Sequence, residues 1–277
     1  MNGIILDLEE HLYHARPELS STQARRLLES PAKYRWEQTH PQAPKVAWDL
    51  GTAAHTKVLG TGARAIVYPP EHLTPSGNVS TKAATVEWAE AQRDAGLTPI
   101  TPEQMGAVDA MAEAVLAHPM ARVLFEQEGG NPEASVFGTD PDTDVPVRAR
   151  FDFLARIAVD LKTARDASPN GFARAAADHG YHIQRAHYLD TLEFAGAEPA
   201  AGFVFVVVES TAPYLVGVYR LNSEFEDIGA ARARRARDIY RRCLDTDTWP
   251  GYGDGIQSLM APFWLVADAS ENQEIAA

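Results

Sequence analysis

Hydrophobic positions recur with two different periods, and the change of period divides the chain into a helical part and a mixed part. Helical spacing, capping residues and proline stops predict helices over residues 20–29, 31–36, 49–59, 82–95 and 102–118. From residue 133 the period shortens to two, which predicts strands over 133–138, 145–154 and 157–163. A helix over 169–195, strands over 203–209 and 214–219, and a helix over 224–243 follow. We therefore expect an α/β (α+β) fold, in which helices flank a mixed central sheet.

The length of 277 residues is compatible with one elaborated domain. We expect a single domain over residues 1–277, made of a mainly helical part (1–128), an αβ core (129–222), and a basic helix with a tail (223–277). Residues 61–81 are rich in proline and glycine and are expected to form a loop. The sequence contains no fixed-period repeat, so solenoid and coiled-coil architectures are not expected.

Charge and cysteine content exclude several classes of function. Lys and Arg number 25 against 38 Asp and Glu, which gives a net charge of −13 and argues against a protein that simply coats phosphates. The one cysteine, Cys243, excludes an internal disulfide, a four-cysteine iron–sulfur cluster and a cysteine zinc cage. The longest apolar run, 203–208, is far shorter than the ~18 residues of a membrane span. The start of the chain does not resemble a secretion signal, so we expect a cytoplasmic protein with no membrane partner.

Two strands of the predicted core carry a pattern of charged residues. Alternation places Asp160 and Lys162 on one face of the strand over 157–163, and Asp152 lies on the polar face of the preceding strand. If residues 154–156 close an antiparallel hairpin, Asp152 and Asp160 lie opposite or diagonal to each other. Paired carboxylates suit Mg²⁺, and a nearby ammonium stabilises charge on a phosphate. The alternative is a surface hairpin with ordinary salt bridges.

The same residues resemble a nuclease motif. Phe151-Asp152 followed by Val159-Asp160-Leu161-Lys162-Thr163 is similar to the core of the PD-(D/E)xK nuclease superfamily, with Phe151 in the proline position. Three other segments resemble the RecE-type exodeoxyribonuclease VIII of phages and prophages: Ser20 to Tyr34 with its Ser-Pro-x-x-Tyr ending, Leu50 to His55, and the Gln-x-x-x-Tyr motif from Gln184 to Tyr188. Their order and approximate spacing agree from about residue 20 to about residue 265.

This resemblance implies roles for individual side chains. It implies that Lys162 is the catalytic lysine and that Gln184 and Tyr188 position the DNA strand. The implied metal ligands are His55, Asp152, Asp160 and the Leu161 carbonyl. Glu133 is a looser candidate ligand, since an exposed edge-strand glutamate is the alternative. Three further histidines have no recognised metal-ligand spacing and are expected to be solvated: His179, His182 and His187.

Basic residues offer an acidic chain a way to hold DNA through backbone contacts. The predicted DNA-binding residues are Arg25, Arg26, Lys33, Arg35, Arg148, Arg150, Arg232 and Arg235. The arginine-rich helix over 224–243 has an alternative interpretation as a solvated face paired with Glu224, Glu226 and Asp238. A net charge of −13 does not contradict DNA binding, because DNA would meet only one cleft.

The resemblance implies an exodeoxyribonuclease that uses Mg²⁺, for which Mn²⁺ would substitute, and that contains no iron–sulfur cluster. It would degrade one strand of linear double-stranded DNA from the 5′ end, as a ring-like homo-oligomer with a RecT-like single-strand annealing protein as partner. Three alternatives stay open. They are a single-strand exonuclease or structure-selective endonuclease of the RecB/Cas4-like type, a non-catalytic DNA-binding module on a decayed nuclease fold, and an unrelated metal hydrolase.

Overall fold

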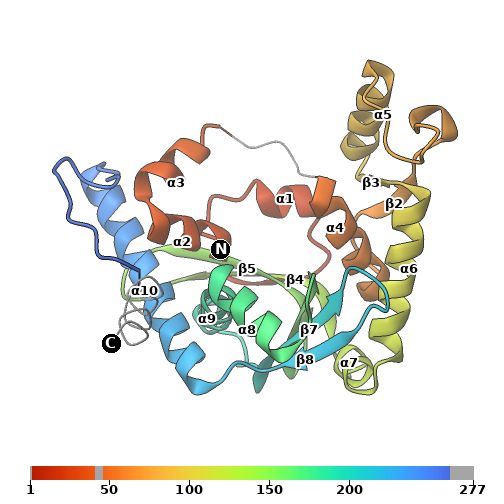
Figure 1. Ribbon diagram of the computed structural model, residues 1–277. Helices are drawn as coiled ribbons and strands as arrows, with labels where there is room; N and C mark the ends of the chain where they lie inside the picture. The colour runs from red at the N-terminus through yellow and green to blue at the C-terminus, as the bar shows by residue number, and fades with distance from the viewer. Residues whose placement is uncertain (1, 41–45, 263–277) are drawn as a thin grey trace, which may run out of the picture.

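The computed structural model describes residues 2–40 and 46–262, and a six-stranded sheet runs through the middle of the molecule (Figure 1). The strand order is β1-β4-β5-β6-β7-β8, and all neighbours are antiparallel except β6 and β7, which are parallel. The strands are β1 (Gly3–Ile5), β4 (Asn131–Thr139), β5 (Pro146–Leu154), β6 (Ile157–Ala164), β7 (Gly202–Glu209) and β8 (Val216–Tyr219). The predicted mixed sheet is confirmed.

Helices lie on both faces of this sheet. They are α1 (Glu10–His14), α2 (Ser21–Glu29), α3 (Pro31–Glu37), α4 (Val46–Leu59), α5 (Ala83–Asp94), α6 (Pro102–Ala117), α7 (Pro119–Phe125), α8 (Pro169–Asp178), α9 (Tyr181–Phe194) and α10 (Ser223–Thr246). Among these described helices, none combines the length and the apolar content that crossing a membrane requires.

A second, two-stranded parallel sheet joins β2 (Arg64–Val67) to β3 (Leu97–Ile100) and projects with α5 from one end of the molecule (Figure 1). The prediction of a loop over 61–81 is therefore wrong in part, since β2 and the short 3₁₀ helix η1 (Pro70–His72) lie within it. Strands of four residues are too short to show a period of two.

The central sheet is buried on both faces, as β7 shows. Phe203, Phe205 and Val207 pack into the core beneath α8 and α9, whereas Val206 and Val208 pack into the core beneath α4, α6 and α7. A strand covered on both sides is expected to be apolar throughout. The uninterrupted apolar run seen in the sequence is therefore a central strand.

Local sequence fixes the start of α2, which forms one wall of the candidate site. The Ser20 hydroxyl accepts a hydrogen bond from the Gln23 backbone N–H, and the Gln23 side chain accepts one from the Ser20 backbone N–H. This reciprocal capping box satisfies two backbone donors that the helix itself leaves unpaired. The Ser30 hydroxyl caps α3 by accepting a hydrogen bond from the Lys33 backbone N–H, without the reciprocal bond, and Pro31 occupies the first turn of this helix.

The predicted single helix over 169–195 is wrong, because the chain forms two helices that meet at Gly180. This glycine has φ of 68° and is the N-cap residue of α9. Side chains disfavour this left-handed region, which glycine adopts without cost. A Cβ at this position would lie 2.8 Å from Cδ of Arg25 on α2, so the break also accommodates a tertiary contact.

Gly180→Ala should therefore lower the free energy of unfolding by more than Gly196→Ala. Gly196 has a similar φ of 70°, but a Cβ there would meet nothing within 4 Å. The control variant should lose about 1 kcal/mol from the backbone conformation alone, and Gly180→Ala should lose about 1 kcal/mol more from the contact with Arg25. Urea unfolding of both variants measures the difference. Equal losses of unfolding free energy in the two variants would show that the Arg25 side chain moves away from the new Cβ without destabilising the protein.

Candidate active site

The carboxylates predicted to form the site lie where the pairing of the central sheet is interrupted. Strands β5 and β6 are bridged at Phe153 and Val159, and one step further along this antiparallel register Asp152 lies opposite Asp160. On the other side of β5, Glu133 of β4 falls opposite Asp152, but the two are not bridged and Glu133 has φ of 52°. The hairpin arrangement of the two aspartates is thus the one predicted.

Groups from β6 and α9 contact these carboxylates. The Leu161 backbone N–H donates a hydrogen bond of 2.7 Å to Oδ2 of Asp152. Oδ2 of Asp160 lies 2.5 Å from Nζ of Lys162, and Oδ1 of Asp160 accepts a hydrogen bond of 2.5 Å from the Gln184 amide. Five of the predicted site residues therefore lie together where β5, β6 and α9 meet: Asp152, Asp160, Leu161, Lys162 and Gln184.

Burial and like charge destabilise the ionised form of these two carboxylates in the absence of a bound metal cation. Burial raises the pKa of Asp152 well above its ordinary range, and the nearby Asp160 carboxylate raises it further. Burial opposes a charge on Lys162, but the carboxylates of Asp160 and Asp152 outweigh it and raise its pKa. Lys162 is therefore an ammonium ion, suited to stabilising negative charge rather than to accepting a proton.

His55 on α4 completes the predicted ligand set. Its Nδ1 lies 3.9 Å from Oδ2 of Asp152, and its ring faces the Leu161 carbonyl. Burial, together with the Lys162 ammonium, lowers the pKa of His55 to about 4, so the imidazole is neutral at physiological pH. A neutral imidazole is the form that binds a metal ion.

The donor set fits a hard divalent cation such as Mg²⁺ or Mn²⁺, which prefers carboxylate and carbonyl oxygens and tolerates imidazole. Asp160 is 1% exposed, and its Oδ2 makes no hydrogen bond of acceptable geometry despite the nearby lysine. An unsatisfied buried oxygen of this kind is suited to a cation. Within residues 2–40 and 46–262, however, no three His, Cys, Asp or Glu side chains are grouped closely enough to hold a metal in their present positions.

A hollow of about 460 Å³ opens beside the carboxylates. Asp152, His55 and Tyr188 line it together with the start of α2. The Tyr188 ring packs 5.0 Å from the ring of Phe151, and burial raises the pKa of Tyr188 well above its usual value. Its phenol therefore stays protonated and can donate a hydrogen bond into the hollow.

Glu133 also lines this hollow, but it is held by a neighbour. Strand β4 lies between β1 and β5, so the alternative of an exposed edge-strand glutamate is wrong. The Arg150 guanidinium donates a hydrogen bond to the Glu133 carboxylate and another of 2.8 Å to the Leu8 carbonyl. Burial raises the pKa of Glu133, and Arg150 partly offsets this effect.

Arg148 has a structural role. It is 4% exposed, and its Nη1 donates hydrogen bonds to the backbone carbonyls of Tyr13, His14 and Arg16. These contacts hold the N-terminal segment against β5. They correct the predicted DNA-contacting role of Arg148, because its guanidinium is committed to the protein interior.

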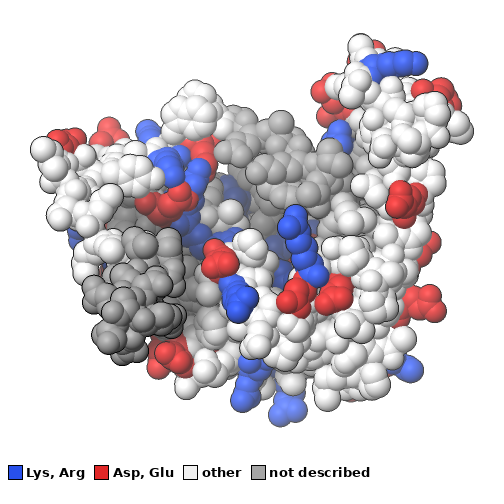
Figure 2. All heavy atoms as spheres, in the orientation of Figure 1, with Lys and Arg blue, Asp and Glu red and all other residues white. Residues whose placement is uncertain are grey.

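Arg150 on β5 is likewise bound to the protein, by Glu133 and the Leu8 carbonyl, which corrects its predicted DNA-binding role. The remaining predicted DNA-binding residues lie toward the surface around α2, α3 and α10. A hollow of about 1030 Å³ beside the site is lined by Arg25, Arg26 and Arg232, and also by Glu29 and Glu37. Arg26 forms ion pairs with both glutamates, and Lys33 forms one with Glu29. The Arg35 guanidinium lies 5.2 Å from the Trp249 ring centroid, and Arg235 is exposed on α10. Acidic and basic groups are interspersed on the face shown in Figure 2.

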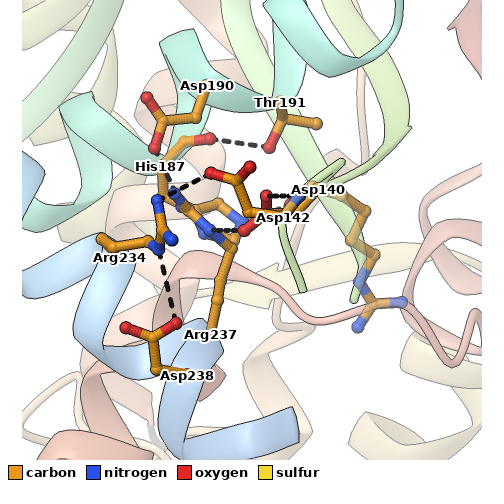
Figure 3. A network of polar contacts seen from close by, with 9 residues as sticks. Asp140, Asp142, His187, Asp190, Thr191, Arg234, Arg237 and Asp238 are labelled. Atoms are coloured by element: carbon orange, nitrogen blue, oxygen red, sulfur yellow. Dashed lines mark hydrogen bonds and ion pairs between the residues drawn. The ribbon is translucent and has the colours of Figure 1, made fainter. Parts of the chain in front are cut away.

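The arginines of α10 divide between the two interpretations of this helix. Arg234 pairs with Asp142 and Asp238, and Arg237 donates to Asp140 and Asp190 (Figure 3). Both arginines fasten the helix to its surroundings, whereas Arg232 and Arg235 are exposed. Arg232 and Arg235, together with the exposed Arg242, are available to a polyanion.

The prediction of solvated histidines holds for His179 and is wrong for the other two. His182 is 3% exposed and its Nδ1 lies 3.1 Å from the Ala176 carbonyl. His187 is fully buried, with Nε2 3.0 Å from the Arg148 carbonyl. Both rings are structural, because each is buried and one of its nitrogens contacts a backbone carbonyl of a neighbouring element.

The sheet and the Asp152, Asp160 and Lys162 arrangement define a PD-(D/E)xK-like domain. The chain matches, over residues 20–262, the family described as a PDDEXK-like domain of unknown function (DUF3799), and it belongs to that family. The predicted resemblance to PD-(D/E)xK nucleases is therefore confirmed. Comparison with curated proteins gives no match.

Solved structures with the same fold include a candidate exonuclease from Eubacterium rectale. Its TM-score is 0.58 at 10% identity, and the alignment covers 96% of this chain and 99% of that one. A phage-related exonuclease from Haemophilus somnus aligns with 71% of this chain and 95% of its own, at 10% identity and a TM-score of 0.30, which is too low to support an argument. At these identities the first similarity shows the fold alone.

Proposed function

We propose that this protein is a divalent-metal-dependent exodeoxyribonuclease that degrades one strand of linear double-stranded DNA from its 5′ end. The observation that carries the proposal is the convergence of Asp152, Asp160 and Lys162 between β5 and β6, with Gln184 bonded to Asp160. The exonuclease name of the Eubacterium rectale protein, whose fold is similar, supports the choice among nucleases.

Each residue of the group has a distinct task under this proposal. The cation would be held by Asp152, Asp160, His55 and the Leu161 carbonyl, since these groups supply the oxygen and nitrogen donors of the site. A bound Mg²⁺ supplies Lewis acidity toward the phosphate and lowers the pKa of a water. The Lys162 ammonium stabilises charge that develops on the phosphate oxygens.

Gln184 and Tyr188 place the substrate. They are four residues apart on α9 and share one face of the helix, with Gln184 at the carboxylates and Tyr188 in the adjoining hollow. The Tyr188 hydroxyl can donate to a phosphate or sugar oxygen of the nucleotide next to the scissile bond. Holding the phosphate at a fixed position relative to the carboxylates contributes to the rate by orientation.

Linear duplex DNA should be consumed in Mg²⁺ while a covalently closed circle of the same sequence stays intact. The reason is that an exonuclease needs a chain end, whereas both substrates offer the same phosphodiesters. The assay compares the two duplexes with single-stranded DNA, each in Mg²⁺, Mn²⁺ and EDTA, and uses 5′ and 3′ end labels to read polarity. Cleavage of the circle at the rate of the linear duplex would contradict an exonuclease, and consumption of single strands only would favour the RecB/Cas4-like alternative.

The proposal extends to a ring-like homo-oligomer and a RecT-like annealing partner in phage-type recombination. Size-exclusion chromatography with light scattering checks the first of these. A monomer that remains fully active on long linear duplexes would contradict the ring.

A further inference from the structure

One face of α9 carries three side chains that point toward the catalytic group. The proposed nuclease function assigns a role to two of them. Tyr181, Gln184 and Tyr188 are spaced by three and four residues, so they lie on the same side of the helix. Gln184 is bonded to Asp160, and Tyr188 lines the hollow beside Asp152. Tyr181 stands at the other end of this row, on the side of Lys162.

The Tyr181 ring is in contact with the Lys162 ammonium. Nζ of Lys162 lies 4.9 Å from the ring centroid, within the range of a cation–π interaction. The same nitrogen lies 2.5 Å from Oδ2 of Asp160. The lysine is therefore held from two sides, by a carboxylate and by an aromatic face.

The ring itself is fixed by other aromatic side chains. Its centroid is 5.8 Å from that of Phe172 on α8 and 5.9 Å from that of Phe205 on β7, in both cases with nearly parallel planes. Both phenylalanines are almost fully buried. The ring therefore provides Lys162 with a rigid support, because it cannot move without disturbing the core between α8 and the sheet.

We propose that Tyr181 is a positioning residue that keeps the Lys162 ammonium where it meets the scissile phosphate. This inference rests on the proposed nuclease function. A lysine side chain has four flexible methylene groups, so an ammonium with a single partner samples several positions. A hollow of about 720 Å³ is lined by Lys162, Tyr181 and Arg174 among others, so an unsupported Lys162 side chain has space in which to move.

Tyr181→Leu should lower kcat about tenfold and leave KM and the dissociation constant for duplex DNA in EDTA unchanged. Tyr181→Phe keeps the ring that contacts Lys162 and should retain kcat within about twofold, since the Tyr181 hydroxyl forms no hydrogen bond with the described residues. The matched control is Tyr219→Leu. Tyr219 stacks on the same Phe172, 5.3 Å away, but does not touch Lys162. The Tyr219→Leu variant should be less stable and should retain the kcat of the unmodified protein.

A double-mutant cycle with Lys162→Gln separates positioning from general damage. If Tyr181 acts through Lys162, adding Tyr181→Leu to Lys162→Gln should cause no further loss of kcat. Multiplicative losses, or equal loss in Tyr181→Phe and Tyr181→Leu, would overturn the inference. If Lys162→Gln itself keeps full activity, the proposed site fails instead, so the two failures are distinguishable.

Discussion

Asp160→Asn should lower the rate of DNA hydrolysis by about 10³-fold or more, because a catalytic cation contributes several kcal/mol and about 4 kcal/mol corresponds to a factor of 10³. Asn has nearly the volume of Asp and can still accept the hydrogen bond that Gln184 donates to this position. Burial is the main reason that the pKa of Asp152 is raised, and the substitution removes the additional repulsion from Asp160. The variant should therefore fold normally, as circular dichroism and thermal unfolding would show, while its activity is lost.

Two further measurements tie this loss to metal binding. Isothermal titration with Mn²⁺ in the absence of DNA should show binding to the unmodified protein and at least about tenfold weaker binding to Asp160→Asn. Asp227→Asn, an exposed aspartate on α10, serves as the matched control and should bind and cleave normally. Substantial activity remaining in Asp160→Asn would refute the assignment of the site.

The relation of Asp152 to Asp160 could be predicted from the sequence because two local rules determine it. Period-two alternation assigns each residue a face, and the short link over 154–156 fixes the hairpin register to within one residue. The observed pairing of Phe153 with Val159 satisfies both rules. Neither rule requires knowledge of distant parts of the chain.

Other features depend on contacts between distant segments, which the local sequence does not determine. Gly180 interrupts a helical pattern, but its left-handed conformation matches a contact with Arg25 of α2. Arg148 looks like a surface cation on a polar strand face, yet its acceptors are backbone carbonyls more than 130 residues earlier. The sequence gives no signal for the role of Tyr181 for the same reason, since its partner Lys162 lies on a different element.

Arg237→Leu should destabilise the protein by about 3–5 kcal/mol, because it leaves a buried carboxylate without its charged partner. Arg237 is 4% exposed, and its Nε donates a hydrogen bond of 2.6 Å to Asp140, which is 1% exposed. Its Nη1 donates a second bond of 2.8 Å to Asp190 on α9, the helix that carries Gln184 and Tyr188 (Figure 3). Burial raises the pKa of Asp190 even with the arginine present, so this carboxylate also depends on its partner.

Arg234→Leu is the matched control, because it removes an arginine from the same helix and the same network. Its side chain is 49% exposed, and it pairs with Asp142 at 2.8 Å and with Asp238 at 3.3 Å. Exposed ion pairs contribute at most about 1 kcal/mol, since solvent screens them. Guanidinium unfolding of both variants gives the comparison. Equal losses would mean that water replaces Arg237 beside Asp140, and the network would then contribute no more than a surface salt bridge to the attachment of α10.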